Sequence, residues 1–291
     1  MNDLLRPIYE KIADSEDILG VLIIEKTQSN SPLTEQFDAI VIVLTRNSEV
    51  QGSPYDVEHY YIDNKMVAVH IIEESKFLEC LSGSNRRRYL LWVLNGRILL
   101  DQDEYLAKLR EELLEFPIDI RKKKIAIEFA KLIRCYSNGK ELYEKKQYLD
   151  AFNLMVQALH HLARLSVIEH GFYPEVTVWN QVKRIEPEVY ALYLELVESS
   201  ERIEKRVELL LLAIEFAISS RSRIGSSYLI EIMKSKKEAW TISELVNDRR
   251  LKDFSMDVAL LLHYLETKNM VQINDEAING QNIFQRKYTV K

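Results

Sequence analysis

The sequence predicts an α+β fold class, in which strands are concentrated in the first third of the chain and helices occupy most of the rest. Three observations predict it. Short β-branched runs near the N-terminus have the length of strands, and the middle of the chain repeats apolar residues at i, i+3 and i+4. The last part combines short helical segments with two closing strands. The predicted domains are residues 1–119, 120–221 and 222–291.

The first domain is predicted to be a mixed sheet with a few helices. Apolar spacing over residues 3–13 predicts an opening helix, and the runs GVLIIE and FDAIVIVLT predict buried strands. The segments EHYYI and MVAVHII flank Asp63-Asn64-Lys65, which predicts a β-hairpin. RYLLWVLN then predicts a helix, RILL a short strand, and LAKLREELLEF a second helix that Pro117 ends.

The second domain is predicted to be all-helical. Its apolar residues recur at helical spacing in four segments, which are IAIEFAKLI, YLDAFNLMVQALHHLARLSVI, EVYALYLELVE and RVELLLLAIEFAI. Gly139, the Gly171–Pro174 turn and Glu186-Pro187 separate them.

The third domain has the pattern of a winged helix-turn-helix. SYLIEIMKSKK predicts a first helix, and Thr241 with Glu244 forms a capping box for the short helix TISELVND. Ser255 is positioned to cap a third helix with a buried leucine stripe. MVQIN and FQRKYTV predict two strands around Asn279-Gly280. Three helices followed by a hairpin are typical of a winged helix.

Charge and composition exclude several classes of protein. The chain of 291 residues has a net charge of −6, and residues 1–119 hold 12 Lys+Arg against 22 Asp+Glu, so −10. No domain is strongly basic, which argues against tight non-specific nucleic-acid binding. No run is long and apolar enough to span a membrane, and the start lacks the apolar core of a signal peptide. The two cysteines, Cys80 and Cys135, lack zinc or disulfide spacing, so we expect a cytoplasmic protein without a membrane partner.

The order of elements in the first domain resembles the nucleotidyltransferase-like domain of the kanamycin-type family. The matching pieces are ILGVLIIE, FDAIVIV, the hairpin and LLWVLNGRILLDQDEYLAKLREEL. The helical middle resembles the substrate-binding helical domain of that superfamily, and the whole layout resembles a bacterial group that ends in a winged helix. The resemblance implies a cleft for a nucleotide or another small-molecule ligand.

Active members of the superfamily carry a Gly-Ser or Gly-Gly pair, an Asp-x-Asp strand and a third carboxylate on a later strand. Carboxylates are needed because Mg²⁺ takes oxygen ligands, and residues i and i+2 of a strand point to one face. At the matching positions this sequence has Gly20-Val21, Asp38 followed by Ile40, and His70. The resemblance therefore assigns Gly20 to cofactor binding, Asp38 as a catalytic remnant, and Asp38 with His70 to a metal.

Because Ile40 cannot bind a metal, we expect a catalytically inactive domain and no cofactor. The alternative is a divergent enzyme that needs Mg²⁺ and uses displaced carboxylates from Glu25, Asp56 or Glu73. A second alternative for Asp38 is a residue at a strand start that forms only local hydrogen bonds.

Other patterns allow a functional or a structural interpretation. Arg164 and His170 have the Arg-x5-His spacing that resembles the ribonuclease motif of HEPN-type domains, but His170 also lies where a histidine caps a helix. The basic runs at 86–88 and 121–124 either hold phosphates or form solvated faces. We favour the structural interpretation in each case.

Aromatic and histidine residues of the helical domain form a further candidate group. His160 and His161 suggest a metal pair only if partners exist, so we interpret them as structural. Tyr173, Trp179 and Lys183 follow a turn where related folds line a cleft, and core packing is the competing interpretation.

The third helix of the winged helix begins Ser-Met-Asp-Val and offers no base-reading side chain in its first two turns. Basic residues flank it instead, and we assign these as candidates for nucleic-acid binding: Arg249, Arg250, Lys252, Arg286 and Lys287. They suit phosphate contact, and a protein partner is the alternative. The sequence as a whole predicts a non-catalytic binding or regulatory protein, with a divergent nucleotidyltransferase or a DNA-binding regulator as the alternatives.

Overall fold

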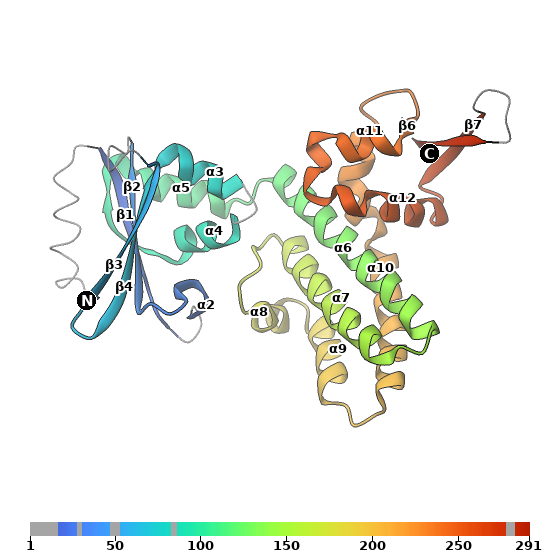
Figure 1. The fold of residues 1–291 in the computed structure, drawn as a ribbon, viewed down its shortest axis with the longest axis horizontal. Coiled ribbons are helices and arrows are strands. Elements are labelled where there is room, and N and C mark those ends of the chain that lie inside the picture. The colour runs from blue at the N-terminus through green and yellow to red at the C-terminus, as the bar shows by residue number, and fades with distance from the viewer. Residues whose placement is uncertain (1–16, 28–30, 47–52, 83–85, 278–282) are drawn as a thin grey trace. The chain divides into compact units, whose positions relative to one another are not determined.

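The computed structural model divides into two compact units, the first ending at Phe116 and the second beginning at Pro117 (Figure 1). The structure describes residues 17–27, 31–46, 53–82, 86–277 and 283–291. The helix predicted for residues 3–13 lies outside these ranges. Within them, no helix is both long and apolar enough to cross a membrane.

A five-stranded sheet with the order β3-β4-β2-β1-β5 forms the first unit. β2 and β4 are parallel and the other neighbours are antiparallel, which confirms the predicted mixed sheet. The three central strands are rich in Val and Ile, whose branched side chains suit a sheet that is covered on both faces. The strands are β1 (Ile18–Glu25), β2 (Ala39–Thr45), β3 (Tyr55–Ile62), β4 (Lys65–Glu73) and β5 (Arg97–Asp101).

Three helices of this unit, α3, α4 and α5, lie on one side of the sheet (Figure 1). The fully buried Phe77 and Trp92 lie on α3 and α4. The helical elements are α2 (Ser31–Thr34), α3 (Glu74–Ser82), α4 (Arg86–Asn95), the 3-10 turn η1 (Gln102–Glu104) and α5 (Tyr105–Leu114).

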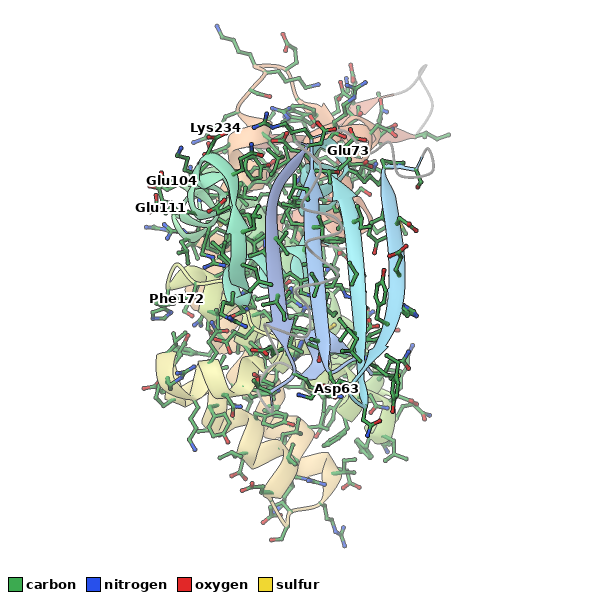
Figure 2. All side chains as sticks on the ribbon, turned by 90° about the vertical axis from the view of Figure 1, so that its left-hand side faces the viewer. Asp63, Glu73, Glu104, Glu111, Phe172 and Lys234 are labelled. Atoms are coloured by element: carbon green, nitrogen blue, oxygen red, sulfur yellow. The ribbon has the colours of Figure 1, made fainter. Side chains whose placement is uncertain are left out.

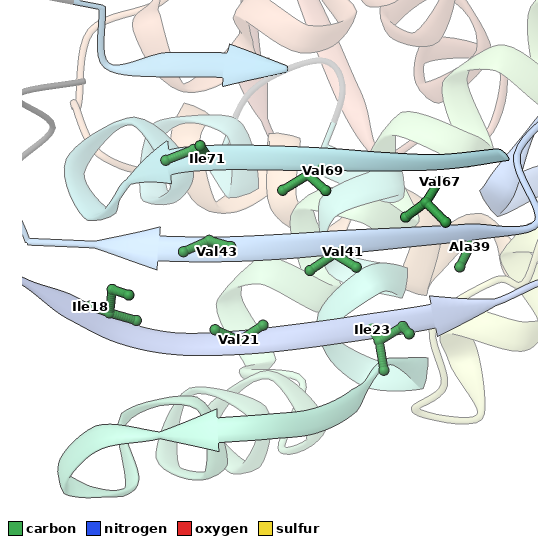
Figure 3. Packing of buried hydrophobic residues seen from close by; sticks show 9 residues of the cluster. All are labelled: Ile18, Val21, Ile23, Ala39, Val41, Val43, Val67, Val69 and Ile71. Atoms are coloured by element: carbon green, nitrogen blue, oxygen red, sulfur yellow. The ribbon is translucent and has the colours of Figure 1, made fainter. Parts of the chain in front are cut away.

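The other face of the sheet carries an apolar cluster from alternate residues of the three central strands (Figure 3). Alternation places these side chains on one face because successive residues of a strand point to opposite sides. The cluster consists of Ile18, Val21, Ile23, Ala39, Val41, Val43, Val67, Val69 and Ile71.

The predicted hairpin between β3 and β4 is confirmed. Its two turn residues, Asp63 and Asn64, both have left-handed backbone angles, with φ of 46° and 60°. Two-residue hairpin turns need positive φ at both positions, and Asn and Asp tolerate it better than most residues.

Five helices open the second unit. The apolar periodicity of the middle domain predicted four of them, and α8 was not predicted. They are α6 (Ile118–Glu144), α7 (Tyr148–Glu169), α8 (Val178–Ile185), α9 (Pro187–Glu198) and α10 (Ile203–Met233).

The prediction of a separate helix after residue 222 is wrong. This segment belongs to α10, which is 31 residues long and has no break at this point. Its serines do not interrupt the helix: the hydroxyls of Ser222 and Ser226 donate to backbone carbonyls one turn earlier, at 3.1 and 2.6 Å. Gly225 allows α10 to approach α6 closely, since an added Cβ would lie 2.3 Å from the ring of Phe129.

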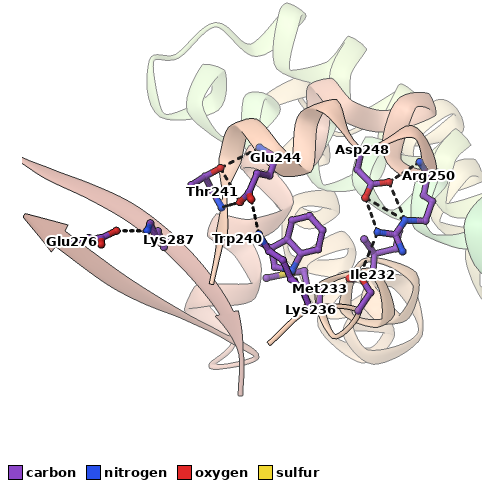
Figure 4. Close-up of polar contacts among 11 residues, drawn as sticks. Ile232, Met233, Lys236, Trp240, Thr241, Glu244, Asp248, Arg250, Glu276 and Lys287 are labelled. Carbon is purple, nitrogen blue, oxygen red and sulfur yellow. Dashed lines mark hydrogen bonds and ion pairs between the residues drawn. The ribbon is translucent and has the colours of Figure 1, made fainter. Parts of the chain in front are cut away.

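The C-terminal part contains the predicted winged helix. Thr241 Oγ1 accepts from the Glu244 backbone N–H at 3.2 Å, and the Glu244 carboxylate accepts from the Thr241 N–H at 2.7 Å, so the capping box is confirmed (Figure 4). The elements are β6 (Trp240–Thr241), α11 (Ile242–Asn247), the 3-10 segment η2 (Arg249–Asp257), α12 (Val258–Thr267), β7 (Val271–Ala277) and β8 (Phe284–Val290), with sheet order β6-β8-β7. The predicted turn at Asn279-Gly280 lies outside the described residues.

The predicted cap of the third helix is wrong. Ser255 lies inside η2, and α12 begins three residues later at Val258. The buried Phe254 has φ −142°, which interrupts helical geometry, and the buried Asp257 Oδ1 accepts from Arg134 of α6 at 2.8 Å. Tertiary contacts with α6 therefore decide where this helix starts.

Candidate functional site

Asp38 lies directly before β2 and forms hydrogen bonds to the neighbouring strand β4. Its Oδ2 accepts from the backbone N–H of Met66 at 2.9 Å, and its own N–H donates to the Met66 carbonyl at 2.8 Å. Asp38 thus joins the start of β2 to the start of β4. These bonds reach a neighbouring strand and are not the local hydrogen bonds that the sequence offered as the alternative to metal binding, so the assignment of Asp38 stays a prediction.

Position 40, where a second metal ligand is required, is fully apolar. Ile40 is 3% exposed and is paired with Ile24 of β1 and with Ala68 of β4. Partners across a sheet point to the same face. None of the three side chains at this level of the sheet can therefore offer an oxygen to Mg²⁺.

His70 does not share an ion with Asp38, which corrects the predicted metal pair. Asp38 bonds to Met66, so His70 lies four residues farther along β4, roughly 13 Å at about 3.3 Å per residue. One ion holds its ligands at about 2–2.6 Å and cannot bridge that span.

The surroundings of His70 are those of a buried neutral histidine. Its Nδ1 lies 2.7 Å from the Tyr55 hydroxyl, and its ring centroid lies 4.9 Å from that of Trp92. Burial, with a smaller effect from His59, lowers the pKa of His70 to about 4. The ring is uncharged at neutral pH and packs beneath α4.

The displaced carboxylates that a divergent enzyme would need are also misplaced. Glu25 is paired with Ala39 and so points to the sheet face opposite Ile40. Asp56 is paired with Ile71, and Glu73 lies beside Thr45 at the far end of β2. Figure 2 shows Glu73 at the end of the strands opposite the Asp63 turn. Among the described residues, no three His, Cys, Asp or Glu side chains lie close enough together to hold a metal ion.

Gly20, the predicted cofactor residue, lies inside β1 and is buried. A Cβ at this position would lie 2.4 Å from Cδ1 of Leu106 on α5. The glycine therefore allows α5 to pack closely on the sheet. The assignment of Gly20 to cofactor binding stays a prediction.

In the second unit, a buried carboxylate joins α6 to α7. Glu128 is 4% exposed, and its two oxygens accept from His161 Nδ1 at 2.8 Å and from Arg164 Nη2 at 2.9 Å. Burial alone raises the pKa of this carboxyl, but the hydrogen bond from His161 and the charges of Arg164 and Lys131 lower it overall. Glu128 is therefore ionised at neutral pH.

This arrangement separates the two residues of the Arg-x5-His pattern. Arg164 is held by Glu128, whereas His170 Nδ1 lies 2.8 Å from the Ser166 carbonyl at the end of α7. Six residues on a helix correspond to about 9 Å of rise and to directions about 120° apart around the helix axis. The structural interpretation of both residues agrees with these contacts.

Beside the Glu128 network, α7, α8 and α9 enclose a pocket of about 240 Å³. The rings of Trp179 and Tyr193 are stacked, with centroids 4.0 Å apart and planes at 18°. His160 lies edge-on to Trp179 at 6.3 Å. The lining residues are Val156, Gln157, His160, His161, Trp179 and Tyr193. Tyr173 and Lys183, which the sequence grouped with Trp179, do not line this pocket.

The predicted nucleic-acid-binding cations differ in their availability. Arg250 is bound to the Asp248 carboxylate through Nη2 at 2.6 Å and Nε at 3.0 Å (Figure 4). Arg249 and Lys252 are exposed.

On the wing, both cations have an acidic partner on the neighbouring strand. Lys287 of β8 pairs with Glu276 of β7, and Arg286 Nε lies 3.8 Å from Asp275 Oδ1. Three of the five predicted cations therefore lie beside a carboxylate that offsets their charge.

Comparison with known proteins decides the family. Residues 1–121 match a family model described as nucleotidyltransferase-like. Residues 122–221 match a YgxA-like substrate binding domain, and residues 227–290 match a helix-turn-helix domain. The protein YgxA of Bacillus subtilis (strain 168) is 42% identical over 291 residues, covering 100% of this chain and 98% of YgxA. The chain belongs to the YgxA family. A crystal structure of a nucleotidyltransferase-like protein from Exiguobacterium sibiricum 255-15 matches with a TM-score of 0.75 and 33% identity, over 99% of this chain and 98% of that one.

Sequence reasoning missed two parts of the helical site in this YgxA-family chain, namely Glu128 and Tyr193. A signal for Glu128 was present: it lies three residues after Ile125 and four before Leu132, so it falls on the buried stripe of α6. A carboxylate on such a stripe needs charged partners on a neighbouring helix. Nothing in the sequence indicated that Tyr193 would stack on Trp179, because α8 and α9 are joined by a turn whose geometry sequence periodicity does not give.

Proposed function

We propose that this YgxA-family protein does not transfer nucleotides and instead binds a small ligand as a regulatory or scaffolding protein. The observation that carries the proposal is the apolar level of the sheet at Ile40, Ala68 and Ile24. Nucleotidyl transfer needs metal ions that orient the triphosphate and offset developing charge. A lone Asp38 engaged with a backbone N–H supplies too few ligands for that purpose.

The helical part of the second unit is the ligand-binding part in this proposal. Its sequence matches a model described as a substrate binding domain, and its pocket combines a half-exposed aromatic wall with polar side chains on α7. Both features are typical of small-molecule sites. The two cysteines are free thiols, which suits the reducing cytoplasm that we propose as its location.

The proposal is tested by incubating the full chain with labelled nucleoside triphosphates, Mg²⁺ or Mn²⁺, and acceptors such as aminoglycosides, tRNA and proteins. We expect pyrophosphate release at background for the wild type and for Asp38→Ala. Release that Asp38→Ala abolishes would establish the divergent enzyme instead. Release above background that survives in Asp38→Ala would also contradict the proposal, because it would show activity that does not depend on Asp38.

A second candidate function, DNA binding through the winged helix, is favoured by the helix-turn-helix match and by the exposed Arg249 and Lys252. The start of α12 is docked on α6 through the Arg134–Asp257 pair, which limits its use as a reading element. The candidate is therefore a phosphate-contacting surface with little base recognition.

A further inference from the structure

The pocket between α7, α8 and α9 has a composition that indicates the kind of ligand it takes. Among its lining residues there is no Lys, Arg, Asp or Glu, so a phosphate or a carboxylate would find no charged partner there. Its volume of about 240 Å³ lies below the range of drug-sized sites and suits one ring system. The ligand group is therefore small and uncharged.

The aromatic wall favours a planar ring. Trp179 and Tyr193 stack on each other and are half-exposed, and both line the pocket. Aromatic side chains hold planar heterocycles by stacking, with a contribution of roughly 1–3 kcal/mol for a nucleic-acid base. The wall thus gives affinity, and the polar groups around it must give selectivity.

His161 has a fixed orientation and a fixed tautomer. Because the Glu128 carboxylate is ionised it can only accept a hydrogen bond, so His161 Nδ1 must carry the proton that it donates across 2.8 Å. A buried carboxylate behind a histidine fixes ring orientation in the same way at many binding sites.

Gln157 lies one helical turn before His161 on the same face of α7, at i and i+4. Its amide carries one acceptor oxygen, which lies 3.9 Å from Cys135 Sγ of α6, next to donor hydrogens. This pair matches an edge on which an amino group stands beside a ring nitrogen, which is the edge that Gln recognises in adenine.

We propose that this pocket binds the planar ring of an uncharged aromatic heterocycle that carries an amino group beside a ring nitrogen, with 6-aminopurine as the representative. Trp179 and Tyr193 supply the stacking wall, Gln157 reads the amino edge, and His161, held by Glu128, contributes a polar ring edge beside Gln157. The inference rests on the proposed ligand-binding function and adds the site and the chemical class of ligand.

The test is calorimetric titration of the full chain with free adenine, hypoxanthine and glucose. Adenine should bind saturably through its 6-amino group and N7, and hypoxanthine at least about tenfold more weakly, because its O6 and N7 on the same edge both accept, whereas the Gln157 amide offers one donor and one acceptor. Gln157→Glu keeps the size but cannot donate, so it should lose about tenfold or more in adenine affinity. Gln272→Glu, on exposed β7, is the matched control and should bind adenine normally.

A second measurement locates the ring. Trp92 and Trp240 are 1% and 7% exposed, so only the half-exposed Trp179 should be quenched by a stacking ligand. In Trp179→Phe, adenine should bind more weakly by calorimetry because the stacking surface is smaller, and the tryptophan quench should disappear. Equal binding of hypoxanthine or glucose, unchanged affinity in Gln157→Glu, or no saturable adenine binding would each overturn the inference. If one of these results is obtained while pyrophosphate release stays at background, the ligand proposal fails but the proposal that the protein does not transfer nucleotides is unaffected.

Discussion

At the residue scale, Glu128 is the charge on which the packing of α6 and α7 depends. It is a nearly buried carboxylate whose two oxygens are both used, by His161 and Arg164. Removing one member of a buried ionic group leaves the others uncompensated, which costs more than the group contributes when intact.

Glu128→Gln should therefore destabilise the chain by roughly 3 kcal/mol, measured by urea unfolding at neutral pH. Glu141→Gln, which removes an exposed pair with Lys145 on the same helix, is the matched control and should change stability little. A similar loss of unfolding free energy in both variants would show that the burial of Glu128 does not add to the cost of replacing it.

The same variant should change the acid sensitivity of the protein. His161 and Arg164 hold the pKa of Glu128 below its usual 4.5 despite burial. A carboxyl with a lowered folded-state pKa stabilises the fold above its unfolded pKa, and that stability is lost as pH falls through the folded value. The difference in Tm between wild type and Glu128→Gln should narrow from about pH 6 to about pH 3. A constant difference would contradict this account.

At the element scale, α10 joins the helical region to the winged helix as one continuous helix. Gly225 is the point of closest approach, since an added Cβ would lie 2.3 to 2.6 Å from ring atoms of the fully buried Phe129. The backbone of α10 thus rests on a side chain of α6, and neither can move alone.

Gly225→Ala should destabilise the second unit by roughly 2 kcal/mol through overpacking, despite the higher helix propensity of Ala. Replacing the ring in Phe129→Leu should make the added methyl group less costly, so a double-mutant cycle should show coupling. An equal cost of Gly225→Ala in both backgrounds would mean that the methyl group is accommodated elsewhere.

The elements also show what the sequence could and could not predict. β-branched runs predicted the central strands, and Asp63-Asn64 predicted the hairpin turn, because both signals are local. The sequence did not predict that α10 is continuous or that α12 starts at Val258. Both features involve contacts with α6, which Gly225 makes with Phe129 and Asp257 makes with Arg134. At the candidate site, the sequence shows that Ile40 replaces the second carboxylate of the Asp-x-Asp pattern. The distance between Asp38 and His70 could be estimated only from the strand register.

At the scale of the whole molecule, the winged helix is the remaining candidate for a macromolecular contact. Arg249 and Lys252 are exposed, while Arg250, Arg286 and Lys287 have carboxylate neighbours. We expect only weak DNA binding, with a dissociation constant no tighter than about 1 μM at physiological salt and no sequence preference.

Fluorescence anisotropy with labelled duplexes at several salt concentrations checks this expectation. Arg249→Ala and Lys252→Ala should each weaken binding and flatten its salt dependence by about one phosphate contact. Lys287→Ala, which removes a paired cation, is the control and should have less effect. Nanomolar binding to one specific sequence in physiological salt would contradict the expectation.

The first unit has a nucleotidyltransferase-like fold, and we propose that it lacks a metal platform at the start of β2. Ile40→Asp restores a second carboxylate two residues after Asp38, on the same face. It also removes a buried apolar side chain and places two like charges together, so the variant should lose roughly 3 kcal/mol of stability without divalent ions. Ile40→Asn is the matched control, because Asn is similar in size to Asp but carries no charge.

Thermal melting with and without millimolar Mn²⁺ tests the claim most directly, because an ion that binds only the folded state raises its Tm. We predict no ion effect on the wild type or on Ile40→Asn, and a clear rise in Tm for Ile40→Asp. A rise in the wild type that Asp38→Ala abolishes would contradict the claim, since it would mean that Asp38 already belongs to an intact metal site.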